Sequence, residues 1–60
     1  MKILFAVAND SGMYGIGDVV LIESYETNDY NEIIATDTCG DEFTAYGVYE
    51  IKGGKINRVI

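Results

Sequence analysis

The feature that most limits how this chain can fold is its division into short apolar runs by clusters of glycine, asparagine and aspartate. β-branched and aromatic residues fill the runs, and these residue types suit the pleated surface of a β-strand. Runs of this length bounded by turn-forming residues indicate strands joined by turns. The sequence therefore predicts five strands, at Lys2–Ala8, Asp18–Tyr25, Glu32–Thr38, Phe43–Ile51 and Lys55–Ile60.

The connection Lys52-Gly53-Gly54-Lys55 is the clearest hairpin signal in the chain. Two adjacent glycines tolerate the positive φ angles of a primed turn. Short strands joined by tight turns predict an all-β fold, a small antiparallel sheet of about five strands. We expect either a curled meander or an SH3-like partial barrel.

One segment leaves a helical alternative open. Asp29 and Glu32 are spaced like a capping box ahead of the apolar residues at 33–35. Thr36, Asp37 and Thr38 would extend a helix poorly, because their side chains favour other conformations. A short helix near residues 29–36 is therefore the alternative to a third strand.

Sixty residues allow a single domain, 1–60, with a small core. A domain of this size buries only about 60% of the surface that its unfolded chain exposes. Cys39 is the only cysteine and there is no histidine, so neither an internal disulfide nor a Cys/His zinc site can add stability. Association with a second copy of the chain is the remaining way to add stability, and we therefore expect a homodimer.

Alternation along the strands predicts which faces are buried. In the fourth strand Phe43, Ala45, Gly47, Tyr49 and Ile51 alternate with Thr44, Tyr46, Val48 and Glu50, which predicts two distinct faces. The first two strands are apolar on both faces. Such strands need cover on both sides, so we expect a second subunit on their outer face.

Charge is segregated along the chain. From Ile3 to Ile51 there is no lysine or arginine, although all ten carboxylates lie in that span. Tyrosines stand among these carboxylates, and tyrosine is enriched at binding hot spots. The predicted partner-binding residues are Tyr25, Glu26, Asp29, Tyr30, Glu32, Asp41 and Glu42. The alternative interpretation is a solvated face that only keeps the protein soluble.

Several chemistries lack the residues that they require. Four cations against ten carboxylates cannot form the basic surface that nucleic acid needs, so we expect no direct nucleic-acid binding. No carboxylate spacing matches a calcium loop, and we expect no metal, cofactor or catalytic residue. Acidic neighbours disfavour a reactive thiolate at Cys39, which we interpret as a small residue at a turn.

The glycine-rich segment at residues 9–17 does not match a phosphate-binding loop, because it has no lysine and no clear helix after it. Its centre is apolar for a loop. Met13, Tyr14 and Ile16 therefore form a possible self-association or docking loop. The first apolar run is too short for a signal peptide, and none approaches the ~20 residues that cross a membrane. These features favour the cytoplasm, that of the host cell if the chain is phage-encoded.

These patterns together favour a non-enzymatic, acidic protein-binding domain. We expect a small inhibitor or modulator of a larger protein with a basic surface, of the type that phages direct against host defence systems. A more specific form of this hypothesis is a nucleic-acid mimic, whose carboxylates are spaced like phosphates. The alternative is a structural or assembly adaptor that docks through sheet edges. A module that binds a ligand under the glycine loop is a third possibility.

Overall fold

A computed structural model describes residues 2–9, 12 and 14–60, and in these residues the chain is all-β, without a helix. Long apolar helices that could span a bilayer are accordingly absent from the described part. The strands are β1 (Ile3–Ala8), β2 (Val19–Thr27), β3 (Ile33–Asp37), β4 (Glu42–Lys52) and β5 (Lys55–Arg58). The five predicted strands are therefore confirmed, with ends that differ by one or two residues.

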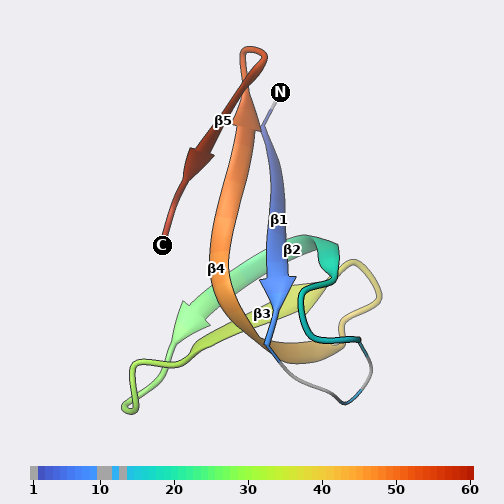
Figure 1. Ribbon diagram of the computed structural model, residues 1–60, viewed down its shortest axis with the longest axis vertical. Helices are drawn as coiled ribbons and strands as arrows, with labels where there is room; N and C mark the ends of the chain where they lie inside the picture. The colour runs from blue at the N-terminus through green and yellow to red at the C-terminus, as the bar shows by residue number, and fades with distance from the viewer. Residues whose placement is uncertain (1, 10–11, 13) are drawn as a thin grey trace.

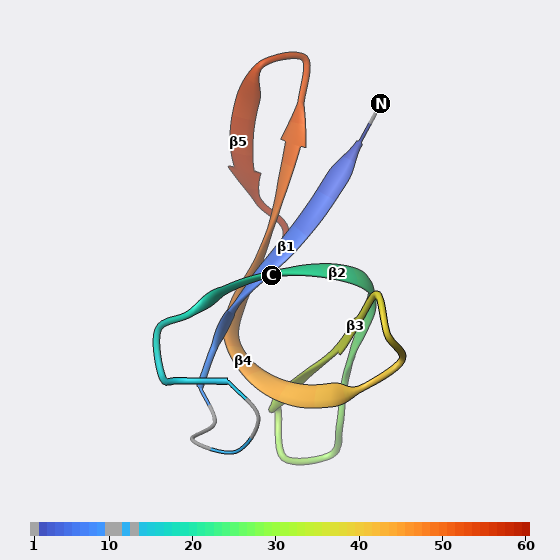
Figure 2. The same ribbon diagram turned by 90° about the vertical axis from the view of Figure 1, so that its right-hand side faces the viewer.

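The strands form one antiparallel meander in the order β1-β2-β3-β4-β5. β1 also pairs with β4, so the first four strands make a partly closed ring (Figures 1 and 2). β4 is long enough to extend beyond the ring, where β5 pairs with it. The β4–β5 turn and the start of β1 consequently lie together at one end of the long axis (Figure 1).

The β4–β5 turn has the geometry that its two glycines predict. Lys52 pairs with Lys55, and Gly53 and Gly54 between them have φ angles of 60° and 78°. Two consecutive positive φ angles define the primed turn that matches the twist of the flanking strands. A side chain at either glycine would be strained, so this dipeptide fixes the hairpin.

The helical alternative at residues 29–36 is wrong. Residues 28–32 form a turn in which Asn31 has a φ of 61°, outside the helical region, and Ile33–Asp37 is a strand. β3 is paired on both edges, with β2 and with β4. These long-range hydrogen bonds outweigh the local capping-box pattern, whose residues serve the turn instead.

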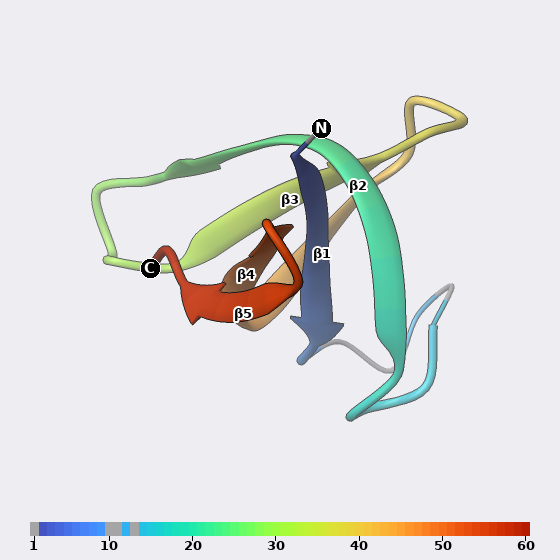
Figure 3. The same ribbon diagram turned by 90° about the horizontal axis from the view of Figure 1, so that it is seen from above.

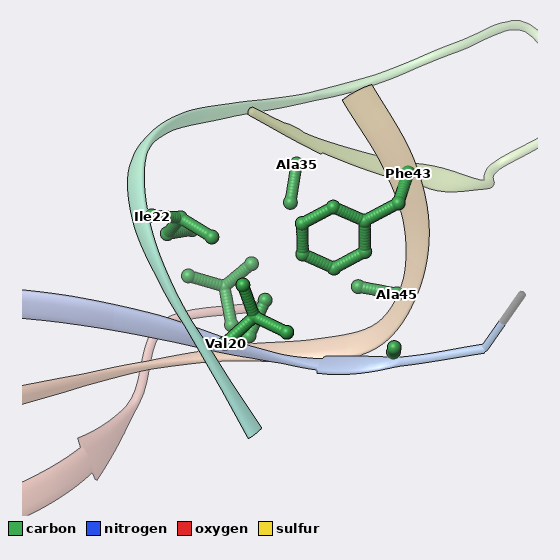
Figure 4. Packing of buried hydrophobic residues seen from close by; sticks show 8 residues of the cluster. Val20, Ile22, Ala35, Phe43 and Ala45 are labelled. Atoms are coloured by element: carbon green, nitrogen blue, oxygen red, sulfur yellow. The ribbon is translucent and has the colours of Figure 1, made fainter. Parts of the chain in front are cut away.

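The core lies inside the ring and is small. It consists of eight buried residues, Ala6, Ala8, Val20, Ile22, Ala35, Phe43, Ala45 and Val48. Figure 4 shows the Phe43 ring pointing across the ring of strands toward Ile22 and Val20. Four of the eight are alanines, whose small side chains let the strands curve closely around the Phe43 ring.

Both long strands contain an extra residue that bends them. In β2, Ile22 and Ser24 pair with the adjacent residues Asp37 and Thr36, which leaves Glu23 bulged. In β4, Tyr46 is the extra residue, because Ala45 and Gly47 pair with neighbours in β1. A bulge increases local bending and twist. Figure 3 shows the resulting curvature of β2 around the interior.

The bulge at Tyr46 corrects the alternation predicted for the fourth strand. Phe43 and Ala45 point into the core as expected, but Val48 is also fully buried whereas Tyr46 is 54% exposed. The extra residue shifts the alternation by one position, so Tyr49 and Ile51 face outward. The two faces expected from the sequence therefore exchange at this point.

Candidate protein-interaction site

The β2–β3 turn is a rigid loop that presents Tyr30. The Asn28 Oδ1 accepts hydrogen bonds from the backbone N–H of Tyr30 (2.9 Å) and Glu32 (3.0 Å), and its Nδ2 donates to Glu32 Oε1 (2.9 Å). An asparagine that binds the following backbone in this way pre-forms a turn. Tyr30 at the tip is 83% exposed, beside the exposed Asp29. Sequence reasoning missed Asn28, although its place at the start of a polar turn is the signal for this role.

Cross-strand pairing gives β2, β3 and β4 a polar outer face. Glu26, Ile34 and Thr44 lie side by side in one row. Ser24, Thr36 and Glu42 form the next row. Paired residues of neighbouring strands lie on one face of a sheet, so both glutamates point outward from the same surface.

Two turns flank this surface, one at each end of β3. Asp29, Tyr30 and Glu32 lie beyond one end of β3, and Asp41 lies beyond the other. Five strand residues separate the turns, a span of about 17 Å at ~3.4 Å per residue. We call this surface the acidic face; it comprises Glu26, Asp29, Tyr30, Glu32, Asp41 and Glu42.

Tyr25 is not part of the acidic face. It pairs with Ala35 on the inner side of the ring and packs against the core. The bulge at Glu23 causes this placement, because it turns Tyr25 inward in place of Ser24. Of the two tyrosines proposed as contact residues, Tyr30 is therefore the one that the structure presents to solvent.

Asp37 organises the β3–β4 turn from a buried position. Its Oδ1 accepts hydrogen bonds from the backbone N–H of Cys39 and Asp41, both at 2.9 Å. Its Oδ2 accepts a 2.5 Å hydrogen bond from the Tyr14 hydroxyl. The carboxylate is thus used within the chain, which explains why this acidic residue is only 4% exposed.

The hydrogen bond between these two side chains changes both pKa values. It lowers the pKa of Asp37 below 3.8, and the backbone N–H groups of the turn act in the same direction, against burial. The same hydrogen bond, with burial and the Asp37 charge, raises the pKa of Tyr14 to about 12. At neutral pH the pair is a neutral phenol that donates to a carboxylate.

The predicted docking loop is placed only in part. Met13 lies outside the described residues. The Tyr14 ring packs edge-on against Phe43, with centroids 5.0 Å apart, so it closes the core. Ile16 is 61% exposed. Of the residues that can be placed, Ile16 is therefore the one available for contact.

A hollow of about 480 Å³ lies next to the Tyr14–Asp37 hydrogen bond. Asp18 and the exposed Cys39 also contribute to its lining. Within the described part of the chain, no three Cys, Asp or Glu side chains are grouped so that they could hold a metal ion. The polar atoms of Asp37 are already satisfied, so this carboxylate acts as a support for the turn.

The cations lie away from the acidic face. Lys2 Nζ is 3.5 Å from Glu50 Oε2, and this is the one ion pair among residues 2–9, 12 and 14–60. Arg58 lies over the Tyr49 ring, 5.8 Å from its centroid. Lys52 and Lys55 flank the β4–β5 turn at the far end of the long axis (Figure 1). The acidic face thus keeps its charge.

The fold and these surfaces define a small antiparallel β-domain with an anionic ring and a cationic hairpin. No protein-family model, curated protein or solved structure matches the chain. Its function is therefore argued from its own surfaces.

Proposed function

We propose that the chain is a non-enzymatic protein-binding domain whose acidic face docks on a basic surface of a larger protein. The supporting observation is that the acidic carboxylates have no cationic partner among the described residues, since the one ion pair lies at the opposite end. A field of one sign accelerates encounter with an oppositely charged surface and fixes its orientation. An inhibitor or modulator of a nucleic-acid-processing protein fits this chemistry, because such proteins carry basic surfaces.

Tyr30 supplies the contact that charge alone does not. Exposed carboxylates mainly steer a partner, whereas an aromatic ring buried at the centre of an interface contributes much of the affinity. Asn28 holds the turn before any partner arrives, so little conformational entropy is lost when Tyr30 is buried. We expect Tyr30→Ala to weaken binding at least about tenfold and leave the fold intact.

The test uses two matched variants of one strand. Glu42→Gln lies on the acidic face and Glu50→Gln lies at the cationic end, and each changes the net charge from −6 by one unit. Proteins captured from a bacterial lysate by the tagged wild type are quantified by mass spectrometry at about 50 and 500 mM salt. A partner of the acidic face is reduced by Glu42→Gln and by salt, and is retained by Glu50→Gln.

Equal recovery by both variants at both salt concentrations would refute the proposal. Displacement of the chain by added DNA, for a partner that meets these criteria, would support the nucleic-acid-mimic form. If capture depends on neither salt nor Glu42, the result would instead favour the alternative role, an assembly adaptor that docks through sheet edges. That role has its own structural basis, because β5 is paired with β4 and is an edge strand of the sheet.

A further inference from the structure

A second outer surface of the sheet is apolar. Leu21 of β2, Phe5 of β1 and Tyr49 of β4 lie side by side, and Arg58 of β5 continues this row. The Phe5 and Tyr49 rings stack with centroids 5.5 Å apart. The pairing thus places aromatic and aliphatic side chains across four strands on one face.

The neighbouring rows have the same character. Ile3, Ile51 and Ile56 lie side by side on one flank of the aromatic row, and Val7 and Val19 lie on the other. Val19 is 67% exposed and Ile56 is 66% exposed. We call these three rows, including Leu21, Phe5 and Tyr49, the apolar face. A contiguous apolar surface of this kind is typical of an interaction site.

The two edges of the apolar face carry opposite charges. On the β2 edge, Glu23 follows Leu21 and is exposed. On the β5 edge, Arg58 lies over the Tyr49 ring and forms no ion pair with a described residue. A surface with an apolar centre, one acidic edge and one basic edge is complementary to a copy of itself turned by 180°.

We propose that the apolar face is the interface of a two-fold symmetric dimer of this chain. A two-fold axis along the strands, between β1 and β4, places β2 of each copy over β5 of the other. Phe5 of one copy then meets Tyr49 of the second copy. Arg58 of the second copy moves from its place over Tyr49 to lie over Leu21, beside Glu23.

A stable dimer requires an interface of a certain size. A stable interface buries about 800 Å² per partner, roughly a fifth of the 4058 Å² that the chain exposes. Four of the five strands contribute to the apolar face. Two such faces would pack as the layers of a β-sandwich, with their strands approximately aligned. The acidic faces remain free, so this proposal is independent of the binding of a basic partner.

The first test is the mass in solution. Light scattering after size exclusion, and sedimentation equilibrium at micromolar concentrations and above, should give twice the chain mass of 6.6 kDa. Val19→Asp should give a folded monomer, because Val19 is exposed in the single chain but buried in the dimer. Tyr30→Ala on the acidic face is the control and should stay dimeric.

A charge exchange tests the orientation. Arg58→Glu and Glu23→Lys should each weaken the dimer about tenfold or more, because each places like charges at both edges. An equimolar mixture of the two variants should recover the dimer. In the mixed dimer the introduced glutamate of one copy faces the introduced lysine of the other, and the native Arg58 faces the native Glu23. Circular dichroism of each variant checks that it is folded.

A wild type that stays monomeric at several hundred micromolar overturns the proposal. If the wild type is a dimer, but Arg58→Glu and Glu23→Lys bind each other no better than each binds itself, the proposal is also overturned. A folded Val19→Asp variant that remains dimeric also overturns it, because the apolar face would then lie outside the interface.

Discussion

The acidic face and the apolar face share two strands, β2 and β4, yet they present opposite chemistries. Where these strands pair with β3, their outward residues include Glu26, Glu42 and Thr44. Where they pair with β1, their outward residues include Val19, Leu21 and Tyr49. In each strand the chemistry changes close to a bulge.

The bulges explain how one strand serves two surfaces. A regular strand keeps one residue parity inward along its whole length. The extra residues Glu23 and Tyr46 shift that parity, so Val20 and Ile22 point inward before the bulge and Tyr25 after it. The residues that point inward are therefore apolar both before and after the bulge. The residues that point outward can differ in polarity between the two segments of the strand.

The largest expected effect tests the bulge in β4. If the strand alternated uniformly, Tyr46 and Val48 would lie on the same face. Asp at either position would then have the same effect on folding. The structure places Val48 in the core and Tyr46 in solvent. Val48→Asp should abolish cooperative unfolding in urea, since an unpaired buried carboxylate costs several kcal/mol. Tyr46→Asp should remain folded, and similar losses in the two variants would contradict the bulge.

An intermediate effect compares adjacent valines of β2 on opposite faces. Val20 is 8% exposed in the core and Val19 is 67% exposed on the apolar face. Val20→Ala should lower the free energy of unfolding by about 2 kcal/mol, because it leaves a cavity. Val19→Ala should lower it by about 0.5 kcal/mol or less in the monomer. Urea titrations at low micromolar concentration measure both, and equal costs would mean that Val19 is also covered within one chain.

The smallest expected effect concerns the hydrogen bond that joins the two regions. Tyr14 precedes β2 beside the apolar face, and Asp37 supports the turn at one end of the acidic face. Tyr14→Phe keeps the ring on Phe43 and removes the donor. The midpoint of thermal unfolding at pH 7 should fall by about 5 °C. An unchanged midpoint would show that the bond adds nothing to stability.

The pH dependence of the same variant gives a second measurement. Because folding raises the pKa of Tyr14 from 10.0 to about 12, its contribution to stability is complete below pH 10 and is lost as the pH rises through 12. Because folding lowers the pKa of Asp37, its contribution is present above pH 3.8 and is lost as the pH falls through the lower folded value. Tyr14→Phe should remove the alkaline loss that is specific to this residue and reduce the acid loss. Identical profiles for variant and wild type would contradict this assignment.

Much of the fold could be predicted from local sequence. Glycine and asparagine clusters mark the ends of strands, and Gly53-Gly54 specifies its turn from the conformational freedom of the residues themselves. The bulges could not be predicted, because an extra residue is defined by the register with a partner strand. The inward position of Tyr25 could not be predicted for the same reason, because it depends on the bulge at Glu23.

The candidate site could also be predicted only in part. The cation-free span Ile3–Ile51 predicted a surface rich in carboxylates, and strand pairing brings Glu26 and Glu42 to one face. The buried, turn-supporting role of Asp37 could not be predicted, since its burial depends on Tyr14, which is distant in the sequence. The binding of a basic partner remains a prediction.

The separation of charge along the long axis has a consequence before any contact is made. With carboxylates concentrated on the ring and lysines at the hairpin tip, the molecule has a permanent dipole moment directed along its length (Figure 1). Near a positively charged surface, such a body experiences a torque that turns its ring forward and its hairpin backward. Diffusion would therefore deliver the chain already aligned, and the hairpin would trail into solvent.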